Sequence, residues 1–150
     1  MPLSNKRIGI DIDETIAATF EAVLNYAKSK YPSIAHCDFD SLTNHDWWLI
    51  PEFESIAQKD VMEVFRDYNK FDTLHVGIFP VDHSMRGIDF LKEQGYSLFA
   101  ITGRDEKNSY DATIHWLDRH FPGIFEQVVF TNHNTEGANR RNKSEICREL

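Results

Sequence analysis

Short apolar runs that end in polar or charged residues constrain the fold of this chain more than any other feature. They lie at residues 7–12, 97–102 and 127–131, and each has the length of a buried β-strand. Residues 81–91 and 110–121 carry apolar side chains at helical spacing. Buried strands separated by helices pair in parallel through right-handed crossovers. The sequence therefore predicts an α/β protein with a parallel sheet, in which the first strand lies beside the second.

The segment between the first and second strands is too long for a plain crossover connection. It carries two stretches with apolar residues at helical spacing, residues 15–30 and 57–68, on either side of an irregular stretch. We therefore interpret residues 16–80 as a helical insertion, called the cap below. Residues 1–15 and 81–150 then form the α/β core.

The composition is that of a folded protein, and its charge disfavours binding to polyanions. Hydrophobic residues make up 41% of the chain and charged residues 27%, which is close to the balance of soluble globular domains. The 24 acidic and 16 basic residues give a formal net charge of −8. This charge disfavours binding to nucleic acid polymers and to anionic membranes, because both need a basic patch. Binding of a small phosphate substrate remains possible, since a local cluster of hydrogen-bond donors can override the global charge.

The cysteines and the N-terminus indicate the compartment. Cys37 and Cys147 form no C-x-x-C pair, so we expect free thiols in a reducing environment. The first residues lead directly into the first strand without the apolar region of a signal peptide. No apolar run approaches the ~20 residues that are needed to cross a bilayer. We therefore expect a cytoplasmic protein.

Asp11 and Asp13 flank one apolar residue at the end of the first strand. Neighbouring carboxylates oppose each other's ionisation, and a divalent cation relieves that cost. Phosphate monoester hydrolysis needs one of the largest known accelerations, up to ~10²¹-fold, so a positioned nucleophile and positive charge are both wanted. Asp11 could attack phosphorus, and Asp13 could protonate the leaving oxygen and then activate water. The alternative is a solvated turn that only caps a helix, but the preceding strand and the following amphipathic helix favour function.

Thr102 and Gly103 lie at the end of the second strand. A hydroxyl together with the backbone N–H groups of a glycine turn can cradle phosphate oxygens, although Thr-Gly is also a common turn. Arg104 is a further candidate for binding an anion. For this residue the sequence favours an exposed arginine in a turn.

Lys143 begins the last predicted helix, after the third strand. A lysine at this place can bridge the nucleophile and the phosphate and neutralise developing charge. Arg140 and Arg141 compete for this role, and a solvated basic turn is the alternative for all three. We rank Lys143 first.

An acidic pair, a hydroxyl and a lysine at successive strand ends, in this order, resemble the haloacid dehalogenase-like hydrolase superfamily. The resemblance runs from about residue 6 to the end of the chain. Within that superfamily it is strongest to the 5′(3′)-deoxyribonucleotidase-like proteins. They share the strand-DxD opening, a helical cap directly after it, and passages similar to residues 79–104 and 113–122. The resemblance implies a three-layer, Rossmann-like parallel sheet.

The resemblance also implies a function and roles for the site residues. Asp11 would be the catalytic nucleophile and Asp13 the acid and base, and both would hold Mg²⁺. Thr102, Gly103 and Lys143 would bind the phosphate. The implied reaction is the hydrolysis of a phosphomonoester through an aspartyl-phosphate. The substrate would be a nucleoside or deoxyribonucleoside monophosphate, or a similar small ester, selected by the cap.

One departure from the family pattern changes these expectations. The family places a fourth acidic motif on a strand beyond the lysine, whereas only residues 144–150 follow Lys143 here. We therefore expect the last core strand or strands to be missing and a homodimer to form through the free edge of the first strand. A non-catalytic or impaired relative with a phosphate-binding or interaction role is the alternative to an enzyme. A phospho-receiver domain ranks third, because neither later strand ends in Asp.

Aromatic residues of the cap allow two interpretations. Trp47, Trp48, Phe53 and Phe65 could form a pocket for a nucleobase, but aromatic residues at such spacing more often form a core. We expect Phe65 in the core. For Trp47 and Trp48 both interpretations stay open.

Overall fold

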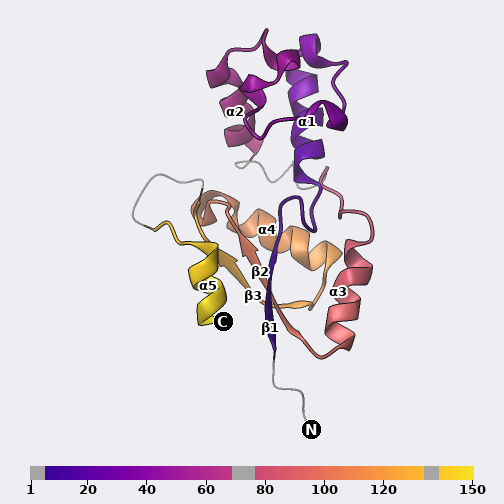
Figure 1. The fold of residues 1–150 in the computed structure, drawn as a ribbon, viewed down its shortest axis with the longest axis vertical. Coiled ribbons are helices and arrows are strands. Elements are labelled where there is room, and N and C mark those ends of the chain that lie inside the picture. Colours follow the sequence, from indigo (N-terminus) through magenta and orange to yellow (C-terminus); the bar gives the residue numbers. More distant parts are fainter. Residues whose placement is uncertain (1–5, 69–76, 134–138) are drawn as a thin grey trace. The chain divides into compact units, whose positions relative to one another are not determined.

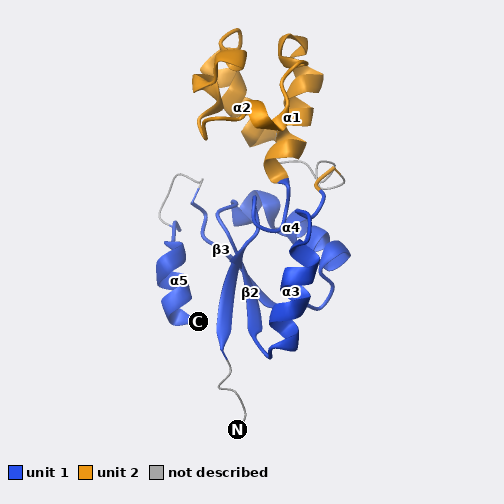
Figure 2. Cartoon of the chain, turned by 45° about the vertical axis from the view of Figure 1, so that its right-hand side comes forward, with its two compact units in different colours: residues 1–18, 79–150 blue, residues 19–78 orange. Residues whose placement is uncertain are grey.

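The computed structural model describes three stretches of the chain: residues 6–68, 77–133 and 139–150. They fold as two compact units, coloured separately in Figure 2. The core unit consists of Met1–Ala18 and Phe79–Leu150, and the cap unit of Thr19–Ile78. Each unit has its own secondary structure and its own apolar interior.

The described part of the core unit contains a three-stranded parallel sheet in the order β1-β2-β3 (Figure 1). The strands are β1 (Arg7–Asp11), β2 (Ser97–Thr102) and β3 (Phe125–Phe130). β1 pairs with β2 from Arg7 opposite Ser97 to Asp11 opposite Ile101. β2 is buried along its whole length, as expected for the central strand. The predicted α/β fold is thus confirmed, with the first strand beside the second.

Helices cover both faces of this sheet. Among the described residues of the core unit they are α3 (Ser84–Glu93), α4 (Glu106–His120) and α5 (Lys143–Glu149). Figure 2 shows α3 and α4 on one side of the sheet and α5 on the other, which gives three layers. Gly95, with φ of 80°, ends the turn after α3 in the left-handed region that favours glycine, as the sequence predicted.

Gly9 lets α5 approach β1 closely. A Cβ atom on Gly9 would lie 2.4 Å from Cδ1 of Ile101 and 3.3 Å from Sγ of Cys147. The first distance is far shorter than a carbon–carbon contact, so a side chain at this position would displace its neighbours. The guanidinium of Arg7 also donates a hydrogen bond of 2.6 Å to the main-chain carbonyl of Leu150. These contacts hold α5, and with it Lys143, against the first strand.

The chain between β1 and the cap unit differs from the prediction. We expected a helix over residues 15–30, but α1 spans Thr19–Lys30. Before it, the N–H groups of Ile16 and Ala17 both donate to the carbonyl of Ile12, at 3.0 and 2.9 Å. Ala17 also forms an antiparallel bridge with Pro80. The apolar residues in this stretch are therefore buried in a hydrogen-bonded loop, and this loop carries Asp13.

The cap unit is helical in its described residues. It contains α1, α2 (Gln58–Tyr68) and, between them, the 3₁₀ turns Pro32–Ile34, Phe39–Ser41, Trp47–Leu49 and Pro51–Phe53. None of the helices in the described parts of the chain is long and apolar enough to span a membrane.

Trp47 lies at the centre of the cap unit. Its side chain is fully buried, and its ring centroid lies 4.7 Å from that of Phe65 and 5.5 Å from that of Phe53. Trp48 is half-buried. The structure therefore assigns Trp47, Phe53 and Phe65 to the packing of the cap unit.

Candidate active site

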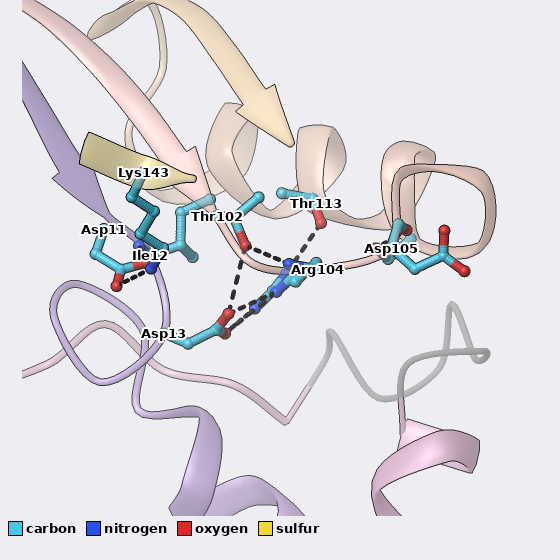
Figure 3. A network of polar contacts seen from close by, with 9 residues as sticks. Asp11, Ile12, Asp13, Thr102, Arg104, Asp105, Thr113 and Lys143 are labelled. Carbon is cyan, nitrogen blue, oxygen red and sulfur yellow. Dashed lines mark hydrogen bonds and ion pairs between the residues drawn. The ribbon is translucent and has the colours of Figure 1, made fainter. Parts of the chain in front are cut away.

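The candidate site lies at the carboxyl ends of β1 and β2. Parallel strands bring the residues that follow them to one edge of the sheet, where ligands bind in α/β proteins. Asp11 ends β1 opposite Ile101, the residue before Thr102. Figure 3 shows Asp13 and Lys143 at the same edge. The structure thus brings together Asp11, Asp13, Thr102 and Lys143, although it leaves their roles as predictions.

The carboxylate of Asp11 is held on both of its oxygens. Oδ1 accepts a hydrogen bond of 2.9 Å from the backbone N–H of Ile12, and Oδ2 accepts one from Nζ of Lys143. The side chains of Asp11 and Lys143 are 39% and 43% exposed. Asp11 is therefore oriented by the protein and still accessible to a ligand from solvent.

Lys143 reaches Asp11 because it begins α5. Asn142 caps this helix, since its side-chain oxygen accepts a hydrogen bond of 2.9 Å from the N–H of Ser144. The two competing arginines have other contacts. Arg140 lies 3.2 Å from the ring of His133, and Arg141 pairs with Glu149. Of the three basic residues, Lys143 is the one that contacts the acidic motif.

Thr102 is fully buried, and its hydroxyl takes part in contacts within the protein. Its Oγ1 lies 3.5 Å from Oδ2 of Asp13 and accepts a hydrogen bond of 3.2 Å from the N–H of Arg104. The hydroxyl therefore helps to shape the turn at Gly103. Phosphate binding by Thr102 and Gly103 stays a prediction.

Arg104 corrects the sequence analysis, which favoured an exposed arginine in a turn. The residue is only 4% exposed. Its Nε lies 3.2 Å from each carboxylate oxygen of Asp13, and Nη2 lies 2.6 Å from Oδ1 (Figure 3). Its Nη1 donates a hydrogen bond of 3.0 Å to Oγ1 of Thr113 in α4. A buried guanidinium needs such a charge partner, and the partner comes from another strand end.

Thr113 is a residue of this site that the sequence analysis missed. It is fully buried in α4. Its neighbours Ala112 and Trp116 belong to the apolar face of the same helix. A hydroxyl on a buried helix face needs a hydrogen-bond partner. That signal was available in the sequence, but it does not reveal which residue the partner is.

The structure also corrects the electrostatic argument for a metal. Each carboxylate of the acidic pair has its own cation, Lys143 for Asp11 and Arg104 for Asp13. Two positive side chains therefore offset the repulsion that we had expected a divalent cation to relieve.

The oxygen donors at this edge still fit Mg²⁺. This ion is often held by one or two carboxylates together with substrate phosphates and water. The exposed carboxylate of Asp11 is such a ligand, whereas the carboxylate of Asp13 is engaged by Arg104. In the parts of the chain that the structure describes, no cluster of three or more His, Cys, Asp or Glu residues could hold a metal. The carboxylate ligand of a magnesium ion here would thus be Asp11, and the other ligands would come from the main chain, the phosphate and water.

No protein-family model and no curated protein matches the chain, but solved structures do. A candidate phosphatase from Clostridium difficile matches with a TM-score of 0.62 and 16% identity, over 98% of this chain and 69% of that one. A candidate phosphoglycolate phosphatase from Lactobacillus delbrueckii subsp. bulgaricus matches with a TM-score of 0.52 and 19% identity, over 97% and 73%. A dehalogenase matches with a TM-score of 0.51 and 10% identity, over 99% and 70%. At such identities the likeness concerns the fold alone, and the chain shares the three-layer α/β fold of these structures.

Proposed function

We propose that this protein is a phosphomonoester hydrolase in which Asp11 is the nucleophile. The observation that carries the proposal is the placement of the Asp11 carboxylate, which is oriented by the N–H of Ile12 and paired with Lys143 but still 39% exposed. A nucleophile for phosphorus needs this combination of fixed orientation, access and nearby positive charge. The likeness in fold to two candidate phosphatases supports the same reaction class.

The reaction proceeds in two steps at the carboxyl ends of β1 and β2. In the first, an oxygen of Asp11 bonds to phosphorus, the ester P–O bond breaks, and Asp13 gives a proton to the leaving oxygen. In the second, water attacks the aspartyl-phosphate, the bond between Asp11 and phosphorus breaks, and Asp13 takes the proton from water. Lys143 stabilises the negative charge that develops on the phosphoryl oxygens. The hydroxyl of Thr102 and the backbone N–H of Gly103 bind those oxygens.

Magnesium is the cofactor that we propose for this site. Asp11 would hold it through its carboxylate and Asp13 through its main-chain carbonyl oxygen, with the phosphate and water as further ligands. When bound, the ion would supply positive charge against the phosphoryl oxygens.

We propose a small phosphate ester as the substrate, with nucleoside and deoxyribonucleoside monophosphates as the first candidates. The similarity of residues 79–104 and 113–122 to deoxyribonucleotidase-like proteins supports this choice. The cap unit would select among such esters. The thiols of Cys37 and Cys147, both free in the structure, support a reducing, cytoplasmic location.

Phosphate release from a panel of esters, with and without Mg²⁺, tests the proposal. The panel contains p-nitrophenyl phosphate, an alkyl phosphate and the common nucleoside monophosphates. We expect Mg²⁺-dependent release by the wild type and by Asp118→Asn, an exposed residue of α4, and none by Asp11→Asn. A wild type that binds inorganic phosphate but releases none from any ester would instead support the non-catalytic alternative.

A further inference from the structure

We infer that Arg104 is a positioning residue that orients the carboxylate of Asp13 for proton transfer. The inference deepens the proposed function and rests on it, since Asp13 is the acid and base of that proposal. The sequence ranked Arg104 as an exposed turn residue, and the geometry points to a different role.

The contact between the two side chains fixes the plane of the Asp13 carboxylate as well as its position. Arg104 approaches both oxygens through Nε at 3.2 Å and Oδ1 again through Nη2 at 2.6 Å. A planar guanidinium that contacts two oxygens restricts rotation of the carboxylate, which a single point charge cannot do. This restraint matters because Asp13 lies in the loop before α1 and outside regular secondary structure.

Arg104 is itself held on rigid elements. Its Nη1 donates to Thr113 of α4 at 3.0 Å, and its backbone N–H donates to Thr102 at the end of β2 at 3.2 Å. The side chain is 4% exposed, whereas Asp13 keeps 29% of its side chain exposed. The arginine is thus buried behind the carboxylate, and the carboxylate keeps an open side toward a ligand.

This arrangement suits an acid that becomes a base. When Asp13 gives its proton to the leaving oxygen, it becomes a carboxylate, and the guanidinium of Arg104 stabilises that product. The same carboxylate, held in the same plane, then takes a proton from the attacking water. Arg104 touches neither the phosphate nor the leaving group in this scheme, so its effect passes entirely through Asp13.

A comparison of two leaving groups distinguishes a positioning role of Arg104 from a merely structural one. p-Nitrophenolate departs without a proton, whereas an alkoxide needs one from Asp13. The ratio kcat/KM covers the steps up to the first irreversible one, which includes transfer of the phosphoryl group to Asp11. We expect Arg104→Met to lower kcat/KM about 100-fold for an alkyl phosphate and less than about 10-fold for p-nitrophenyl phosphate, within the ~10²–10⁴-fold range of acid–base catalysis. Asp13→Asn should show the same pattern.

Conservative variants sharpen this test. Arg104→Lys keeps the positive charge but loses the planar group that contacts both carboxylate oxygens. It should therefore restore only part of the kcat/KM for the alkyl phosphate. Thr113→Val removes the hydrogen bond between Arg104 and Thr113. It should lower kcat/KM more for the alkyl phosphate than for p-nitrophenyl phosphate, by a smaller factor than Arg104→Met. Arg86→Ala, on the exposed face of α3, should leave kcat/KM unchanged for both esters. An equal loss for both esters, in proportion to the folded fraction measured by circular dichroism, would overturn the inference.

A second measurement does not depend on activity. In ¹⁵N-labelled protein, the Nε–H group of Arg104 should exchange slowly with water in the wild type and rapidly in Asp13→Asn, with no change in Asp118→Asn. If the wild type hydrolyses neither ester, the proposed function fails, and slow exchange that depends on Asp13 still shows that Arg104 orients Asp13. Exchange at Arg104 as rapid as at the exposed Arg86 would overturn the inference, whatever the activity.

Discussion

Lys143 and Asp11 stand 132 positions apart in the chain and form an ion pair at the carboxyl end of β1. The pair exists because α5 packs on the first strand where Gly9 leaves room for Cys147. Both side chains are about two-fifths exposed, and ion pairs this accessible contribute only ~0–1 kcal/mol to stability. The ion pair is therefore better explained by a role in the proposed reaction than by a contribution to the stability of the fold.

Asp11→Asn should abolish phosphate release and leave the fold intact. The substitution removes the nucleophile, but it breaks only an exposed ion pair, so the free energy of unfolding should change by less than about 1 kcal/mol. Phosphate release and urea unfolding of the same sample measure the two effects. Hydrolysis at close to the wild-type rate would show that Asp11 is not the nucleophile.

Asp13→Asn should destabilise the protein as well as slow its hydrolysis of alkyl phosphates. It leaves the guanidinium of Arg104, which is 4% exposed, without its charge partner. Removing one member of a buried pair costs ~3–5 kcal/mol, and we expect about 2 kcal/mol here because Asp13 is partly exposed. Urea unfolding of Asp13→Asn beside Asp11→Asn tests the difference.

The double variant Asp13→Asn/Arg104→Met is the control for that prediction. It removes the unpaired charge together with its partner, so most of the lost stability should return. A double variant that is less stable than Asp13→Asn would show that the cost has another origin.

Gly9→Ala should destabilise the core unit by overpacking. The new methyl group would lie 2.4 Å from Cδ1 of Ile101, and inserting a methyl group into a packed core costs ~1–3 kcal/mol. Ile101→Val removes that atom, so the double variant should cost less than the sum of the single variants. Gly87→Ala is the matched control in α3. Its Cβ meets nothing within 4 Å, and the helix should gain about 0.5–1 kcal/mol.

Trp47→Ala should lower the stability of the cap unit much more than Trp48→Ala. Trp47 is fully buried among aromatic rings of the cap unit, and truncating such a residue costs ~3–5 kcal/mol. Trp48 is half-buried, so its truncation should cost less. Thermal unfolding of both variants measures the difference. A stable Trp47→Ala variant with weakened substrate binding would place Trp47 in a pocket instead.

The free edge of β1 leads to a prediction about assembly. In the described residues β1 pairs with β2 alone, and an unpaired edge invites pairing with another chain. We therefore predict a homodimer through this edge, which sedimentation at micromolar concentrations would detect. A monomer over the same range of concentrations would contradict it.

Much of the core could be predicted from the sequence because the signals are local. Apolar runs, helical periodicity and Gly95 indicate strands, helices and a helix end within a few residues of chain. The rule that parallel strands share one carboxyl edge then places Asp11, Asp13 and Thr102 together. The start of α1 was predicted wrongly, because Ile16 fits the helical pattern but lies in a loop that is hydrogen-bonded to Ile12 and bridged to Pro80.

The environment of each charge was decided only by the tertiary structure. Nothing near Arg104 in the sequence distinguishes a buried guanidinium from a solvated one, since its partner Asp13 lies 91 positions away. The same holds for Lys143, whose contact with Asp11 depends on how α5 packs at Gly9. The residue types and their positions at strand ends are properties of the sequence. Which cation neutralises which carboxylate is not, because a charge is buried only where a distant segment folds against it and offsets the loss of water.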